Sequence, residues 1–239
     1  MQLSAESGLS LIELMLGLLV GSIVVAGGIH LYSNNVNLNK TTQQRNTLNQ
    51  DLRAMLDVMQ RDLRRAGFAA NHPDSNNDGS LDAVIKNNPF ALIELNTEQN
   101  CIVYLINKNA NNPPAETNER LGFKIDVDTS FRPAKSVIRM RRSSQGLDCE
   151  SGIWENFTSP EVEITALQFS INETPLNVTA FKQNPTNPVI QNCATGDACL
   201  YRRNIAIRLT GRLVARPEIQ QTLSASVTVR NDRFIAHVP

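Results

Sequence analysis

The sequence lacks the motifs that mark the commonest classes of enzyme. It contains no Gly-x-Ser-x-Gly elbow, no His-Glu-x-x-His helix and no glycine-rich phosphate loop after a strand. Only 3 histidines are available as acids, bases or metal ligands. We therefore expect a protein that is not an enzyme and that requires no cofactor.

An excess of charge of one sign is also missing. The 23 basic residues balance the 23 acidic residues, so the whole chain offers no electrostatic reason to bind nucleic acid or an anionic surface. Local clusters occur at Arg139, Arg141 and Arg142 and at Arg202 and Arg203, without interleaved aromatic residues. We predict no direct nucleic-acid binding, and we interpret these arginines as a solvated face or as partners of acidic neighbours in an assembly.

Cysteine is scarce, and its spacing does not fit a metal site. The 4 cysteines, Cys101, Cys149, Cys193 and Cys199, form no Cys-x-x-Cys or Cys/His cluster. An oxidising compartment with two disulfides fits best, whereas four buried thiols would suit a cytosolic protein. Three pairings are open; the short separation of Cys193 and Cys199 favours a ring there, which leaves Cys101 with Cys149. Trp154 is expected to pack near Cys149.

One long hydrophobic run dominates the N-terminal region. From Leu9 to Tyr32 the chain is almost continuously apolar, and a helix of roughly 24 residues would cross about 30 Å of hydrocarbon. A secretory signal would begin with a basic stretch, but a short polar leader without Lys or Arg comes first here. Within the run, the carboxylate of Glu13 must be neutralised by a partner or reach the membrane interface.

Residues Gly8 to Met15, GLSLIELM, resemble the class III signal of type IV prepilins and type II secretion pseudopilins. The resemblance implies that prepilin peptidase cleaves after Gly8 and methylates the new N-terminus at Leu9, where the family usually has phenylalanine. Glu13 then becomes the fifth mature residue. In the family this glutamate is thought to pair with the N-terminal amine of a neighbouring subunit, which would supply the neutralising charge.

The apolar pattern changes to a helical stripe beyond the membrane segment, at spacings of three and four residues: Leu48, Leu52, Met55, Leu56, Met59 and Leu63. Basic residues before Gly67 indicate that the helix ends near Ala66. We predict one helix from Leu9, on the order of 85 Å long. The predicted organisation is a leader (1–8), a membrane-spanning or filament-core half (9–35), an amphipathic half (36–66) and a β-rich head (67–239).

The head shows short apolar runs separated by Asn, Pro and Gly, which predict antiparallel strands. They are Cys101–Ile106, Leu121–Val127, Ser136–Arg141, Val162–Ile171, Asn204–Ala215 and Leu223–Asn231. The predicted class is α+β, with the long helix packed on an antiparallel sheet as in the type IV pilin fold that the resemblance implies. Residues Gln44 to Gly67 are similar to a PilW-type minor pilin and, next, to a J-type minor pseudopilin.

A second motif places oxygen ligands at alternate positions around a glycine turn: Asp74, Asn76, Asp78, Ser80 and Asp82. This pattern suits Ca²⁺, but position twelve of an EF-hand loop would be glutamate and is Ile85 here. Another ligand would be needed. The alternative is a surface turn that binds no metal, because Asp, Asn and Gly favour turns by themselves.

These features together predict a minor pilin that helps to initiate pilus assembly at or near the tip. The expected partners are other minor pilins, the major pilin, prepilin peptidase and the inner-membrane assembly platform. The chain would cross the inner membrane once with a periplasmic head, and later stand in a pilus at the cell surface. The alternatives are a minor pseudopilin of type II secretion and a membrane-anchored, calcium-dependent adhesion or binding module.

Overall fold

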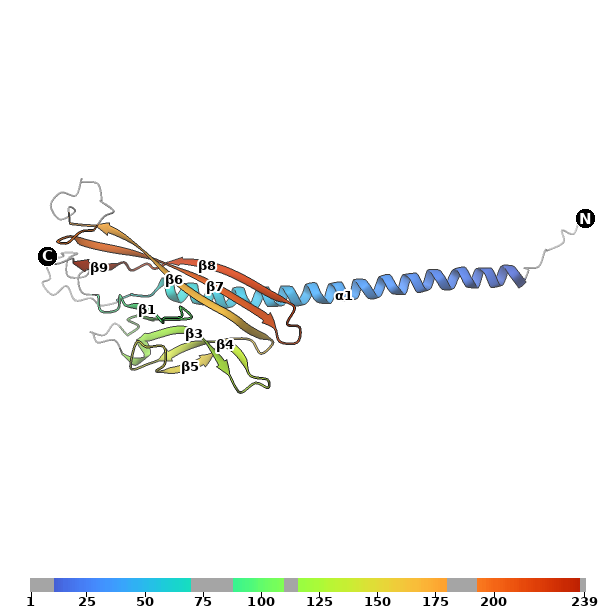
Figure 1. Ribbon diagram of the computed structural model, residues 1–239, viewed down its shortest axis with the longest axis horizontal. Helices are drawn as coiled ribbons and strands as arrows, with labels where there is room; N and C mark the ends of the chain where they lie inside the picture. The colour runs from blue at the N-terminus through green and yellow to red at the C-terminus, as the bar shows by residue number, and fades with distance from the viewer. Residues whose placement is uncertain (1–10, 70–87, 110–115, 180–192, 237–239) are drawn as a thin grey trace, which may run out of the picture. The chain divides into compact units, whose positions relative to one another are not determined.

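The computed structural model describes residues 11–69, 88–109, 116–179 and 193–236 (Figure 1). The chain divides into two compact units, Met1–Thr47 and Leu48–Pro239. Each unit is described by itself below. The helix α1 (Leu11–Arg64) belongs to both, because its 54 residues run from the first unit into the second.

The first unit consists, as far as it is described, of the first part of α1. Apolar side chains cover this part on all sides and are exposed, from Leu11 at 78% to Tyr32 at 72%. Glycines and serines interrupt the run without ending the helix, and Ser22 donates its hydroxyl hydrogen to the carbonyl of Leu19 at 2.8 Å. The predicted continuous helix is confirmed from Leu11 onward.

The second unit contains the rest of α1, whose predicted stripe is buried. Leu48, Leu52, Met59 and Leu63 have no exposed surface, so this face is core. The helix ends at Arg64 and is followed by a turn in which Gly67 takes φ = 78°, a conformation that glycine adopts without strain. The amide of Gly67 then donates to the carbonyl of Leu105 at 2.8 Å, which fixes the end of the helix against the sheet.

The head has two antiparallel sheets. The first sheet has the order β1-β2-β3-β4-β5, and the second has β6-β7-β8 with β9 paired to β7. The strands of the first sheet are β1 (Ile93–Leu95), β2 (Cys101–Leu105), β3 (Arg120–Asp128), β4 (Lys135–Ser143) and β5 (Ile153–Asn156), with the short helix η1 (Thr117–Glu119) before β3. Those of the second sheet are β6 (Val162–Asn177), β7 (Ala198–Leu213), β8 (Gln220–Thr228) and β9 (Arg233–Ala236).

The predicted α+β class, a long helix followed by an antiparallel head, is confirmed. The six predicted strands correspond to β2, β3, β4, β6, β7 and β8. Three short strands, β1, β5 and β9, were not predicted, because three or four residues carry too little alternation to stand out from a loop.

One hydrophobic core joins the helix and both sheets. Phe123 of the first sheet and Phe169 and Ile205 of the second are buried in the same cluster as Leu52. The amide of Phe169 donates to the carbonyl of Gln99 at 2.7 Å, so the sheets are also linked through their backbones. The described part of the head is therefore one packed body built on the helix and both sheets.

Candidate functional site

Two groups of predicted site residues lie outside the described residues. They are the processing position, Gly8 and Leu9, and the calcium loop, Asp74, Asn76, Asp78, Ser80 and Asp82. Cleavage, N-methylation and calcium binding at these positions stay predictions. In the part of the chain that is described, no three His, Cys, Asp or Glu side chains come together in a way that could hold a metal ion.

Glu13 lies in the first turn of α1 and is exposed among apolar side chains. Its neighbours Leu11, Ile12, Leu14 and Met15 are all more than half exposed. An acidic group in the first turn is favoured by the positive end of the helix dipole. The structure therefore places a carboxylate at the beginning of an exposed apolar helix, as the sequence predicted.

The first part of α1 is long and apolar enough to cross a membrane. Its most apolar window of 18 residues has a mean hydropathy of 2.2, and none of that window is buried within the chain. A core helix of a globular protein would be mostly covered by its own fold. The N-terminal helix can thus serve as a membrane anchor for the head.

Two disulfides cross-link the head. Cys101 at the start of β2 is bonded to Cys149 in the loop before β5, and Cys193 is bonded to Cys199 at the start of β7. These are the pairs that the short separation of Cys193 and Cys199 favoured. Each disulfide has one buried cysteine, Cys101 in the first and Cys199 in the second. Both of these cysteines lie at the start of a core strand.

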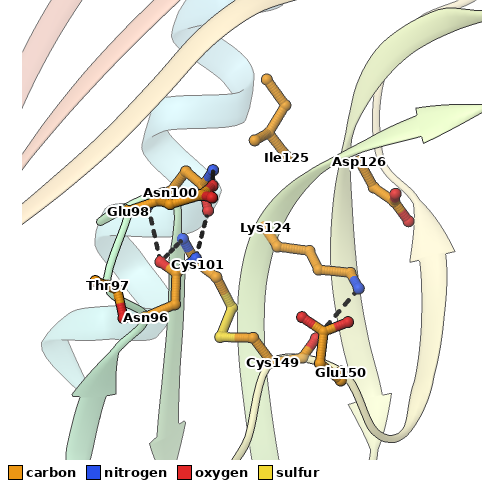
Figure 2. A pocket seen from close by; sticks show the side chains of 10 residues that line it. All are labelled: Asn96, Thr97, Glu98, Asn100, Cys101, Lys124, Ile125, Asp126, Cys149 and Glu150. Carbon is orange, nitrogen blue, oxygen red and sulfur yellow. Dashed lines mark hydrogen bonds between the residues drawn. A yellow bond between two sulfur atoms is a disulfide. The ribbon is translucent and has the colours of Figure 1, made fainter.

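A polar hollow of about 390 Å³ opens beside the first disulfide (Figure 2). Lys124 reaches across it and donates to the carbonyl of Cys149 at 3.2 Å. On the opposite wall, Asn96 accepts hydrogen bonds from the amides of Asn100 and Cys101. These polar groups hydrogen-bond one another, so the hollow is part of the local architecture that holds the disulfide loop.

Buried arginines are the main feature that the sequence did not predict. The interpretation of the arginine clusters as a solvated face is wrong for Arg141 and Arg203, which are 0% and 2% exposed. Arg141 donates to the carbonyls of Arg120, Leu121 and Asp148, and it lies over the ring of Trp154. Burial lowers the pKa of the Arg141 guanidinium, but three carbonyl acceptors compensate for the lost hydration.

Arg203 is buried in a similar way beside the turn that follows α1. Its guanidinium donates to the carbonyls of Ala91 and Asn231, and it lies close to Gly67 after α1. It therefore links the helix end, the segment before β1 and the segment before β9. No short sequence signal would have found this, because the acceptors come from distant segments.

Arg139 and Arg142 pair with carboxylates of the same chain, whereas the pairing of these arginine clusters with acidic neighbours in an assembly stays a prediction. Arg139 contacts Asp126 at 3.0 Å, and Arg142 contacts Glu155 at 2.6 Å. Trp154 lies near Cys149 as expected, since its indole donates to Ser151 and its ring faces Lys124. These contacts are structural ones between neighbouring strands.

Comparison with known proteins gives one family. The model of prepilin peptidase-dependent protein B matches residues 41–229, which include the second part of α1 and nearly all of the head. No curated protein and no solved structure matches the chain.

The family match and the N-terminal segment support the same conclusion from separate residues. The match begins at residue 41, whereas the membrane-length apolar run lies before it. Dependence on prepilin peptidase implies that this enzyme processes the protein, and a pilin-like family indicates a structural role. The chain belongs to the prepilin peptidase-dependent protein B family and is a pilin-like protein with a membrane-length N-terminal helix and a disulfide-linked β head.

Proposed function

We propose that this protein is a minor pilin, of the PilW type, that helps to start type IV pilus assembly and sits in or near the pilus tip. The observation that carries the proposal is the exposed apolar helix with Glu13 in its first turn, attached to a head with its own core. The chain itself leaves that apolar surface uncovered. Lipid would cover this apolar surface before assembly, and other subunits would cover it afterwards.

The proposed mechanism starts in the inner membrane. Prepilin peptidase removes residues 1–8 and methylates Leu9, and the processed helix joins other minor pilins on the assembly platform. Glu13 pairs with the N-terminal amine of a neighbour, because a carboxylate in hydrocarbon needs an opposite charge. Major pilin subunits are then added beneath this initiating complex, and the head is carried to the cell surface.

The first experiment measures the N-terminal mass of the protein from membranes of cells with and without prepilin peptidase. We expect an N-methylated Leu9 that depends on the peptidase. An intact Met1 in both strains would contradict entry into the pilus pathway and leave a simple membrane-anchored protein.

The second experiment replaces Glu13 by alanine and counts surface pili by electron microscopy. We expect few or no pili with normal processing at Leu9, because the variant is cleaved but lacks the charge that pairs with its neighbour. Ser22→Ala, on the same helix, is the matched control and should assemble normally. Normal pili combined with lost protein secretion would assign the chain to a type II secretion pseudopilus instead.

A further inference from the structure

Four arginines surround one open hollow at the end of α1. Arg61 and Arg64 belong to the last turn of the helix, Arg65 follows it, and Arg230 comes after β8. Asp57 and Gln60 complete the lining of a hollow of about 380 Å³. All four arginine side chains are exposed, so their guanidinium groups are accessible to a partner. This set of four is called the arginine hollow below.

Two hydrogen bonds hold the distant arginine beside the helix. The amide of Arg230 donates to the carbonyl of Arg64 at 3.1 Å, and the side-chain amide of Gln60 donates to the carbonyl of Ser226 at 2.9 Å. The end of α1 is thereby attached to the end of β8. The fold itself brings Arg230 and Arg64 together.

The positive charge of the arginine hollow is not balanced by the other residues that line it. On the strands, arginines face carboxylates: Arg139 with Asp126, Arg142 with Glu155 and Arg212 with Glu163. Among the residues that the structure describes, no ion pair involves the four arginines of the hollow, and Asp57 is the one carboxylate in its lining. In the lining of the hollow, four positive charges therefore stand against one negative charge.

The helix dipole explains only part of this arrangement. The negative end of the dipole favours basic residues in a last turn, which accounts for Arg61 and Arg64. It does not account for Arg230, which comes from a distant segment of the chain. Gathering like charges costs energy that an anionic partner would recover.

The spacing of the arginine positions suits an extended acidic segment. The Cβ atoms of residues three apart on a helix, such as Arg61 and Arg64, lie about 5–6 Å from each other. Alternate side chains of an extended chain lie about 6.6 Å apart on one face. Each arginine can then take one carboxylate in a bidentate pair.

We propose that the arginine hollow binds an acidic segment of a neighbouring protein subunit, with Glu or Asp at alternate positions. This inference rests on the proposed assembly function and names the chemistry of one partner. A head that is built into a filament meets the side chains of other subunits, which makes a protein carboxylate the expected anion. Lipid phosphate and free phosphate are the competing anions that the test separates.

The test measures binding of a labelled ten-residue peptide of alternating Glu and Ser by fluorescence anisotropy. The protein is the full chain in zwitterionic detergent, and a peptide with Gln in place of Glu is the neutral probe. We expect the Glu peptide to bind at least about tenfold more tightly than the Gln peptide, with an affinity that falls as salt rises. Arg61→Glu with Arg64→Glu should lower the affinity by at least about tenfold.

The matched control reverses two exposed arginines outside the hollow, Arg132→Glu with Arg208→Glu, which changes the net charge equally. This control should bind the Glu peptide like the wild type, and both variants should still unfold in one cooperative transition, which shows that they remain folded. Equal binding by the hollow variant and the wild type would overturn the proposal. Stronger competition by inorganic phosphate or by phosphatidylglycerol mixed into the detergent micelles than by unlabelled Glu peptide would also overturn it, in favour of a phosphate ligand.

The peptide measurement is independent of pilus assembly, so the two proposals can fail separately. If the peptide binds in an arginine-dependent way but deletion of the protein leaves pili unchanged, the proposal for the arginine hollow stands and the pilus role is rejected. If processing depends on the peptidase and deletion abolishes pili but the peptide does not bind, the pilus role stands and the proposal for the arginine hollow is rejected.

Discussion

The two parts of α1 share one backbone conformation and have opposite surroundings. In the first unit, Leu18 is 70% exposed and Val24 is 67% exposed. In the second unit, Leu52 and Leu63 are 0% exposed. The same residue types in the same helix are therefore uncovered in one unit and form a core in the other.

The glycines show the same contrast. A methyl group added at Gly17 or Gly21 would meet nothing within 4 Å. A methyl group added at Gly122 of β3 would lie 2.6 Å from the carbonyl oxygen of Ile102. Space is thus available along the first part of α1 and is already filled around Gly122 in the first sheet.

Helical structure alone therefore does not determine the function of a helix. The head buries its stripe against its own strands, and it needs no other molecule for that purpose. The first part of α1 leaves its apolar surface to be covered by something outside the chain, since water is a poor solvent for it. Changes in the head should therefore alter its stability, and changes in the first part should alter membrane insertion and assembly.

The largest expected effect comes from one truncation made in each part of the helix. Leu52→Ala should destabilise the head by about 3 kcal/mol, because it removes buried methyl groups and leaves a cavity. Leu19→Ala, at a side chain that is 55% exposed, should leave the head unchanged. Unfolding of the full chain in detergent, followed through Trp154 in denaturant, measures both. A similar loss of stability in the two variants would break the comparison.

The next effect tests the first part of α1 by adding a charge. Ile23→Lys should raise the free energy of membrane insertion by about 3 kcal/mol, since lysine replaces an apolar side chain near the centre of the span. Ala54→Lys, on the exposed face of the second part, is the matched control. The fraction retained in membranes after alkaline extraction should fall for Ile23→Lys alone. Full retention of that variant would mean that the apolar run is not the anchor.

The sequence predicted the long elements because their patterns repeat many times. The stripe from Leu48 to Leu63 and the strands of five or more residues each repeat their pattern, so single exceptions do not hide it. The short strands β1 and β5 have too few residues to repeat a pattern. Their existence depends on pairing with β2 and β4, which is a tertiary effect.

The candidate site was predictable only where it is local. Glu13 within an apolar run is visible in the sequence, because a charge there is unusual by itself. The burial of Arg141 depends on carbonyls of Arg120 and Leu121 in β3 and of Asp148 in a later loop. The arginine hollow likewise needs Arg230 from beyond β8. Composition and periodicity contain no information about which distant segments of the chain come into contact.

A smaller effect should come from filling space at one glycine in each unit. Gly122→Ala should cost about 2 kcal/mol, because the new methyl group overlaps a backbone carbonyl that cannot move freely. Gly21→Ala should leave the unfolding midpoint of the head unchanged, since its surroundings are open within the chain. Chemical denaturation of both full-length variants gives the difference. If Gly122→Ala were neutral, the first sheet would be looser than its contacts indicate.

The smallest effect concerns pH and again separates the head from the apolar helix. Hydrogen bonds from the hydroxyl and amide of Ser151 lower the pKa of Asp148 to about 2, against about 3.9 in an unfolded chain. Because the folded pKa is depressed, the ionised carboxylate stabilises the head above about pH 4, and this contribution is lost as the pH falls towards 2. Asp148 is exposed, so we expect less than about 1 kcal/mol.

Asp148→Asn should therefore flatten the acid limb of the stability profile, whereas the exposed control Glu218→Gln should not. Trp154 reports on this loop directly, since its indole donates to the carbonyl of Ser151 at 3.0 Å. Its fluorescence midpoint in denaturant, measured at pH 5 and at pH 2.5, gives the difference between the variant and the wild type. Membrane retention of the variant should stay unchanged, because Asp148 belongs to the head. An equal acid response in both proteins would show that the loop around the first disulfide is held by Cys149 and Arg141 without help from this carboxylate.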